Sequence, residues 1–150
     1  MSRKTNDLMY EAGSEFEIGK GVVVREGKDA TIIACGIMVG KALKAAAALA
    51  EKGIDCAVID MFTIKPLDEE LVVEYAKKTG CVITAENHNK FGGLYSSVAE
   101  CLAAKCPTPI GYVAVEDEFG EVGPQDYLEQ RFGLTAEHIA EVVEETIKRK

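Results

Sequence analysis

The sequence has little positive charge, no long apolar run and no closely spaced pair of cysteines. Its 17 lysine and arginine residues are outnumbered by 25 aspartate and glutamate residues, and the net charge is -8. Such a balance argues against nucleic acid or an anionic membrane as a partner, because both are themselves negative. No apolar stretch approaches the ~18 residues of a membrane span, and no signal peptide is recognised, so a cytoplasmic location is predicted.

Closely spaced metal ligands are also missing. The five cysteines are odd in number and none belongs to a C-x-x-C pair. Cys35, Cys56 and Cys81 lie in or beside apolar runs, so they are predicted to be small buried side chains with reduced thiols. Zinc sites need closely spaced ligands, and the sequence therefore predicts no metal site. Ser96 and Ser97 lack the G-x-S-x-G context of a hydrolase.

The chain divides into a short arm and one domain. Residues 1–14 are polar without a hydrophobic period, which predicts a linker from a preceding domain. Residues 15–150 are long enough to bury a core as one domain. Asp68 and Thr135 are predicted helix N-caps, and Gly80 a helix end. Periodicity predicts strands at 16–24, 30–35, 57–60, 81–85 and 110–115, and helices at 39–52, 69–78, 95–105, 126–132 and 136–148.

The order of these elements predicts the fold class. The first two strands are joined by the short turn at 26–29, so they are expected to pair as an antiparallel hairpin. Later strands alternate with helices, which implies parallel strands, right-handed crossovers and helices on both faces of the sheet. The prediction is therefore an α/β fold with three layers, α/β/α, and a mostly parallel five-stranded sheet with one antiparallel strand.

The densest group of polar residues follows the strand at 81–85. Glu86 and His88 come directly after it, and Gly92 and Gly93 precede the next helix. One interpretation is a carboxylate and an imidazole that bind a ligand or transfer protons at the carboxyl end of a strand. The other, favoured by the residues alone, is a solvated loop in which Glu86 caps the helix amides. The glycine pair allows close approach of a ligand or another chain.

A second notable loop follows the last strand. It contains Asp117 and Phe119, and it is expected at the same sheet edge as His88 because both follow parallel strands. Its carboxylates are able to bind a cation, although acidic loops are more often simply solvated. Phosphate-binding turns are not favoured, since Gly36 and Gly40 supply only G-x-x-x-G.

Several motifs in register resemble the C-terminal domain of transketolase, especially the bacterial two-subunit type. The resemblance extends over residues 16–148. Its segments are F-E-I-G-K-G at 16–21, R-E-G-K-D-A-T-I-I-A-C-G at 25–36, V-I-D-M-F-T-I-K-P-L-D at 58–68, T-A-E-N-H at 84–88 with Gly92 and Gly93, D-E-F-G at 117–120 and F-G-L-T at 132–135.

The resemblance implies membership of a transferase of the pentose phosphate pathway that moves two-carbon ketol units between sugar phosphates. In that family two other domains hold thiamine diphosphate and a divalent metal. No catalytic residue, cofactor or metal is therefore expected on this chain alone, and the isolated chain is expected to be inactive. The expected partners are the thiamine-binding domains or subunit of the same enzyme, together with further copies in a dimer or other homo-oligomer.

The resemblance also implies roles for particular residues. Arg3 stands near the position of the family's substrate-phosphate arginine, and a guanidinium suits bidentate phosphate contact. The loops expected to face a catalytic cleft or an interface contain Glu86, His88, Gly92, Gly93, Asp117 and Phe119.

Other identities remain open at the level of sequence. The same domain occurs in deoxyxylulose-phosphate synthase and in the β-subunits of 2-oxo acid dehydrogenases, both of which rank behind transketolase. A stand-alone interaction module is a further alternative. A third is a doubly wound domain that binds a small ligand through the loops of His88 and Asp117.

Overall fold

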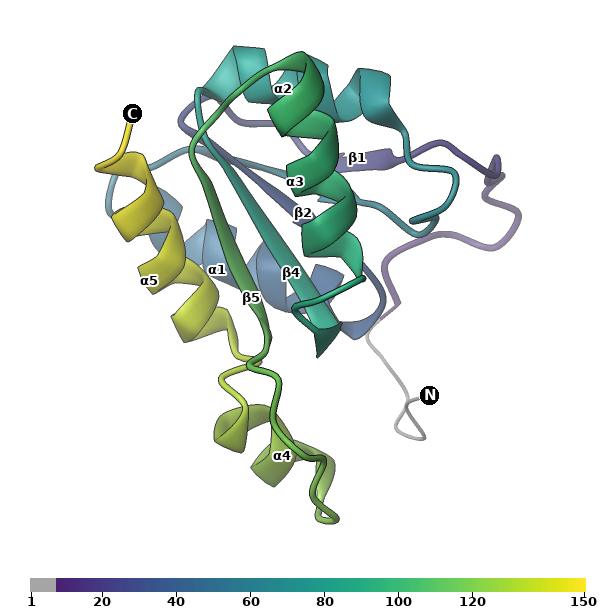
Figure 1. Cartoon of the computed structure of the whole chain (residues 1–150), viewed down its shortest axis with the longest axis vertical. Helices are drawn as coiled ribbons and strands as arrows, with labels where there is room; N and C mark the ends of the chain where they lie inside the picture. Colours follow the sequence, from purple (N-terminus) through teal and green to yellow (C-terminus); the bar gives the residue numbers. More distant parts are fainter. Residues whose placement is uncertain (1–7) are drawn as a thin grey trace.

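The computed structural model describes residues 8–150, and a five-stranded sheet runs through their centre (Figure 1). The strands lie in the order β1-β3-β2-β4-β5, and β1 alone is antiparallel to its neighbour. The predicted fold class is thus confirmed. The strands are β1 (Val22–Arg25), β2 (Ala30–Ala34), β3 (Cys56–Asp60), β4 (Val82–Asn89) and β5 (Ile110–Val115).

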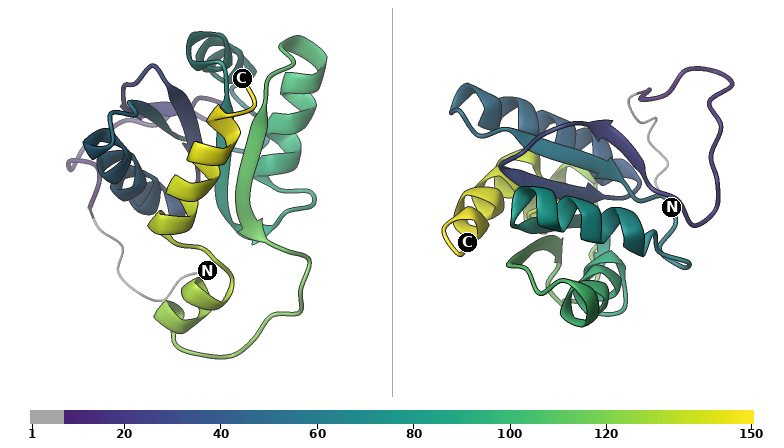
Figure 2. Two further views of the ribbon diagram at one scale, coloured as in Figure 1. Left: turned by 90° about the vertical axis from the view of Figure 1, so that its left-hand side faces the viewer. Right: turned by 90° about the horizontal axis from the view of Figure 1, so that it is seen from above.

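Helices cover both faces of the sheet, as Figure 2 shows. One core lies beneath α1 and α5, and the other beneath α2 and α3. Neighbouring side chains of β2 enter opposite cores, Ile32 the first and Ile33 the second, because successive side chains of a strand alternate in direction. The helices are α1 (Ile37–Glu51), α2 (Glu69–Thr79), α3 (Leu94–Lys105), α4 (Gln125–Arg131) and α5 (Ala136–Ile147).

Helix ends follow the local chemistry of the sequence. The Asp68 carboxylate accepts a hydrogen bond from the Leu71 amide at 3.2 Å, and the Thr135 hydroxyl accepts one from the His138 amide at 3.2 Å. Gly80 ends α2 with a φ of 75°, in the left-handed region that glycine adopts without strain. The predicted caps are therefore confirmed.

The predicted hairpin is wrong. β1 pairs antiparallel with β3, which lies between β1 and β2. The link between the two strands instead passes over the start of β3, where the amides of Lys28 and Asp29 donate to the Asp55 carbonyl at 2.9 and 2.8 Å. A short link in sequence allows a hairpin but does not require one, since β3 gains more burial between two strands than at an edge.

Gly27 makes this crossing possible. A Cβ at this position would lie 2.2 Å from the Ala57 nitrogen and 2.2 Å from the Cys56 carbonyl carbon. Both are backbone atoms of β3, so no side-chain rearrangement would relieve the clash. The antiparallel position of β1 therefore depends on a residue without a side chain.

The segment before β1 is attached to the sheet although it contains no helix or strand within residues 8–21. The Tyr10 and Phe16 rings meet edge to face at 4.8 Å, and Phe16 and Phe62 meet at 5.3 Å. The Tyr10 hydroxyl donates to Asp60 Oδ2 at 2.8 Å. The strand predicted at 16–24 begins only at Val22, and the assignment of residues 1–14 to a linker stays a prediction.

Asp60 is a largely buried carboxylate, only 6% exposed. Burial raises its pKa, and the hydrogen bond from Tyr10 offsets part of this rise. Its second oxygen, Oδ1, is buried without a hydrogen-bond partner among the described residues. The ionised form of Asp60 is therefore incompletely satisfied in the folded chain.

We expect Gly27→Ala to destabilise the domain by about 3 kcal/mol, the upper end of the usual cost of overpacking. Gly40→Ala is the matched control, because Gly40 lies within α1 and a Cβ there would meet no atom within 4 Å. This control should gain up to about 1 kcal/mol from helix propensity. Urea unfolding measures the change in stability of both variants. Equal changes would contradict the conclusion that Gly27 is needed where the chain crosses β3.

Asp60→Asn should change the pH dependence of stability. The raised pKa means that folding favours the protonated carboxyl, so wild-type stability falls as pH rises from the unfolded pKa of about 3.9 through the folded pKa. The amide has no such titration. As pH rises through this range, the stability of the variant should increase relative to that of wild type. Below the unfolded pKa, the difference in stability between the two proteins should not change with pH. Urea unfolding across the pH range tests this, and a difference independent of pH would refute it.

Candidate functional site

The candidate site lies at the carboxyl ends of the parallel strands. β4 continues to Asn89, four residues beyond the predicted end at Ala85. Glu86 and His88 therefore belong to the strand and not to the solvated loop that was expected. The pairing between β4 and β5 is irregular between Ala85 and Asn89, which separates this end of β4 from the regular sheet.

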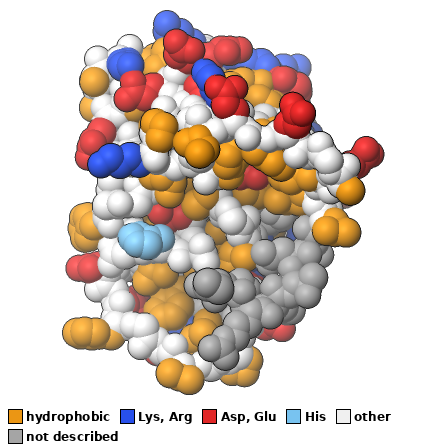
Figure 3. All heavy atoms as spheres, turned by 90° about the vertical axis from the view of Figure 1, so that its right-hand side faces the viewer, with side chains coloured by type: hydrophobic (Ala, Val, Ile, Leu, Met, Phe, Trp, Pro, Cys, Tyr) orange, Lys and Arg blue, Asp and Glu red, His pale blue; other side chains and the backbone are white. Residues whose placement is uncertain are grey.

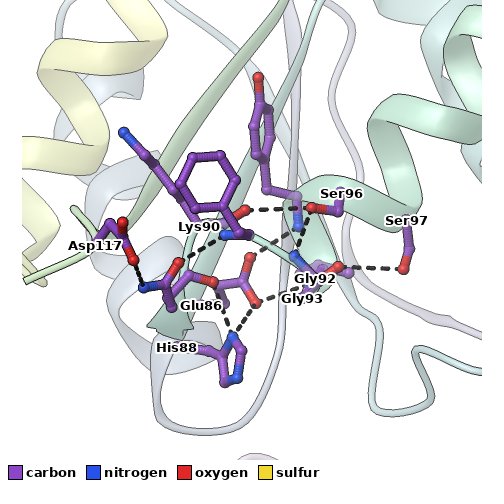
Figure 4. Close-up of polar contacts among 12 residues, drawn as sticks. Glu86, His88, Lys90, Gly92, Gly93, Ser96, Ser97 and Asp117 are labelled. Carbon is purple, nitrogen blue, oxygen red and sulfur yellow. Dashed lines mark hydrogen bonds and ion pairs between the residues drawn. The ribbon is translucent and has the colours of Figure 1, made fainter.

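Glu86 is buried, with 1% exposure, and both of its carboxylate oxygens are engaged. Oε2 accepts from the Leu94 amide and Oε1 from the Tyr95 amide, each at 2.8 Å (Figure 4). These amides form the first turn of α3, where the helix dipole favours negative charge. Of the two interpretations, the capping role is thus the one observed, although Glu86 reaches α3 from the neighbouring strand.

The glycine pair allows this cap to form. Gly92 has a φ of 75°, in the left-handed region. A Cβ at Gly93 would lie 2.1 Å from Glu86 Oε2 and 3.0 Å from His88 Nδ1. Gly93 thus leaves space for the carboxylate at the position where a helix usually carries its own capping side chain. Both predicted glycines serve this turn.

His88 differs from Glu86 in being accessible, with its side chain 62% exposed. Its Nδ1 lies 2.8 Å from the Asn89 carbonyl oxygen, which only accepts, so Nδ1 carries the proton. Nδ1 is also 4.0 Å from Glu86 Oε2. In the neutral ring, Nε2 then retains its lone pair. His88 is the exposed member of the site that is able to accept a proton or a hydrogen bond.

The loops after β4 and β5 meet, as the sequence predicted. Asn89 Nδ2 donates to Asp117 Oδ1 at 2.8 Å, and Lys90 Nζ lies 2.6 Å from Glu116 Oε2. Asp117 has a positive φ of 49°, which directs the chain away from the sheet. Phe119 is fully exposed beyond this point. Arg3, the predicted phosphate ligand, lies outside the described residues.

Two residues of this edge were not predicted as site residues. Cys35 follows β2 and Asp60 ends β3, so a thiol and two carboxylates stand at the ends of β2, β3 and β4. Burial, with added effects of the Glu86 and Asp60 charges, raises the pKa of the Cys35 thiol to about 12. Cys35 is therefore a neutral thiol at physiological pH and not a thiolate nucleophile. The sequence signal was the position of both residues at strand ends.

No group of three or more metal-ligating side chains occurs among residues 8–150. The same residues include no helix long and apolar enough to span a membrane. The polar groups of the edge are instead tied to backbone amides and to each other, so the site as it stands is a network that orders two loops.

Comparison with known proteins identifies the family to which the chain is similar. Residues 19–139 match the family described as transketolase, C-terminal domain. The chain is 52% identical over 136 residues to the 6-deoxy-6-sulfo-D-fructose transketolase subunit SqwH of Clostridium sp. (strain MSTE9), covering 91% of this chain and 42% of that protein. It is 43% identical over 138 residues to 1-deoxy-D-xylulose-5-phosphate synthase 1 of Geobacter sulfurreducens, covering 91% of this chain and 22% of that protein.

A solved structure is similar over almost the whole chain. It is described as a split gene transketolase, an inactive beta4 tetramer, and it superposes with a TM-score of 0.94 at 45% sequence identity. The match covers 97% of this chain and 48% of that one, so the chain spans less than half the length of these relatives. On the family match and these identities, the chain belongs to the transketolase C-terminal domain family.

Proposed function

We propose that this chain is the C-terminal domain of a split transketolase and contributes to two-carbon ketol transfer between sugar phosphates. The observation that carries the proposal is the 52% identity to a transketolase subunit over 91% of the chain. In the complete enzyme, thiamine diphosphate with a divalent metal supplies the carbon nucleophile. We place both on a separate thiamine-binding domain or subunit.

The contacts of the strand-end residues support the placement of the cofactor site outside this domain. Both Glu86 oxygens accept hydrogen bonds from α3 amides, and the Cys35 thiol stays protonated at physiological pH. Both Glu86 oxygens are thus used within the domain, and the Cys35 thiol is not a thiolate nucleophile. We therefore assign neither the cofactor site nor a catalytic step to the described residues. The role of this edge is to hold the loops after β4 and β5 in place.

An assembly role is supported by the surface. Large apolar side chains are exposed at Phe91, Phe119 and Val122, and contiguous apolar patches on a protein surface typically mark interaction sites. Figure 3 shows one face on which hydrophobic side chains gather below a rim of charged groups. The solved relative is described as a tetramer, and we propose that this chain likewise forms a homo-oligomer as well as binding its thiamine-binding partner.

A second candidate is synthesis of deoxyxylulose phosphate. It is favoured by the 43% identity to a 1-deoxy-D-xylulose-5-phosphate synthase over 138 residues. The aligned segment makes up 22% of that relative, so most of that enzyme lies outside the region that this chain matches.

The proposal predicts activity only on reconstitution. The chain should be mixed with the complementary thiamine-binding subunit of the same organism and assayed for ketol transfer from sugar phosphates, with 6-deoxy-6-sulfo-D-fructose as a second donor. Activity should require both proteins, and calorimetry should detect no thiamine diphosphate binding by the chain alone. Tight stoichiometric binding by the isolated chain would refute the proposal. Formation of deoxyxylulose phosphate without ketol transfer would favour the second candidate.

Glu86→Gln should separate a structural from a catalytic role. The amide offers only one acceptor to the two α3 amides, so stability should fall by about 1–2 kcal/mol in urea unfolding. His88→Ala, next to it on the exposed side, should stay within about 0.5 kcal/mol of wild type. At a temperature where Glu86→Gln is fully folded, the reconstituted enzyme should keep its kcat. A loss of about a hundredfold, typical for removal of a general acid or base, would contradict the structural role.

A further inference from the structure

Residues 116–131, named here the acidic arm, project from the end of β5 away from the rest of the domain (Figure 1). The arm contains the loop that follows β5 and the short helix α4. Its base is attached to the domain by several contacts: Asn89 Nδ2 donates to Asp117 Oδ1 at 2.8 Å, Lys90 Nζ lies 2.6 Å from Glu116 Oε2, and Lys41 Nζ of α1 lies 2.6 Å from Glu129 Oε2. The arm therefore has a defined position relative to the sheet.

Ion pairs also order the arm internally. The Arg131 guanidinium reaches back to the loop, with Nη2 2.6 Å from Glu118 Oε2 and Nε 2.9 Å from Glu121 Oε1. The Tyr127 hydroxyl donates to Glu121 Oε2 at 3.1 Å. One arginine thus holds two loop carboxylates while its own position is set by α4. Such pre-organisation lowers the entropy that a binding partner must overcome.

The arm presents two apolar side chains to solvent. Phe119 is 100% exposed and Val122 is 103% exposed, each beside a carboxylate that Arg131 holds. In the free domain these side chains bury nothing, so they add nothing to its stability. A fully exposed aromatic ring on an ordered projection is typical of a residue that becomes buried in an interface.

The charge around these side chains limits the kind of partner. Residues 116–126 include five acidic side chains and no lysine or arginine. Lys90 pairs with Glu116, and Arg131 pairs with Glu118 and Glu121. Burial against another acidic surface would be repulsive, whereas basic side chains around a hydrophobic pocket would match both the charge and the apolar tip. A second copy of this chain, whose net charge is -8, fits poorly.

We propose that the acidic arm is the docking element for the thiamine-binding subunit, with Phe119 and Val122 inserted into an apolar pocket rimmed by lysine or arginine. This inference rests on the proposed function for the identity of the partner. The chain covers 42% and 48% of two relatives, so more than half of each lies outside the region that this chain matches. Arg131 acts as a positioning residue, because it orders the arm without itself forming the apolar tip.

The test measures association of the full chain with the complementary thiamine-binding subunit by surface plasmon resonance. The double variant Phe119→Ala and Val122→Ala should raise the dissociation constant at least about thirtyfold, the size of an interface hot spot. Ile18→Ala is the control, because Ile18 is also well exposed, at 78%, but lies outside the arm. Glu118→Gln should weaken binding while leaving the apolar tip intact, because it removes a charge that matches the basic rim and a contact with Arg131 that orders the arm. Affinity should also fall as salt is added.

The outcomes separate this inference from the proposed function. Wild-type association that is unaffected by the double variant, or weakened equally by Ile18→Ala, overturns the docking role of the arm and leaves the proposed function in place. Complete lack of association overturns both. Urea unfolding must give the same midpoint for the double variant and wild type, as expected for side chains that bury nothing in the free domain. If the double variant is destabilised, Glu118→Gln is the deciding variant, and undiminished binding by Glu118→Gln overturns the proposal.

Discussion

A buried carboxylate bonded to two amides orders the functional edge of this domain. Glu86, at the end of the central region of the sheet, accepts from the first turn of α3 and thereby fixes where that helix begins. The arrangement requires glycine at position 93, because a Cβ there would occupy the space of the carboxylate. The Glu86 carboxylate thus joins β4, the glycine turn and α3 through charge-assisted hydrogen bonds, and this contact sets the positions of the loops beside it.

This coupling explains why a site with the composition of an active centre acts as a scaffold. Carboxylates, a thiol and an imidazole all occur at the strand ends. The two most buried carboxylates, however, form their hydrogen bonds within the domain, and one of them does so incompletely. Glu86 is saturated by amides, and Asp60 is held by Tyr10 with one oxygen left without a partner. Burial also keeps the Cys35 thiol protonated. The reactivity of these carboxylates and of the thiol therefore depends more on desolvation and internal hydrogen bonds than on the type of residue.

The exposed side chains that are able to interact with other molecules lie beyond the sheet, on segments that the sheet edge holds in place. His88 is exposed next to the Glu86 cap, and the acidic arm begins where Asn89 binds Asp117. Ordered projections with exposed apolar tips lose little entropy on binding, which suits a domain whose relatives are more than twice its length. The rigid core and the outward arm together fit a family member whose proposed task is to assemble an enzyme.

Local chemistry in the sequence was sufficient to predict much of the fold: apolar period located the strands, and Asp68, Gly80 and Thr135 marked helix ends that the structure confirms. These signals act within a few residues, where hydrogen bonding and backbone preference decide conformation. The partner of β1 was not predictable, because the position of β3 between β1 and β2 depends on burial across the whole sheet and on Gly27 packing against a distant backbone. Likewise, the sequence placed Glu86 and Gly93 in one motif, but only the tertiary structure determined that the carboxylate is buried, since burial depends on which elements pack over it.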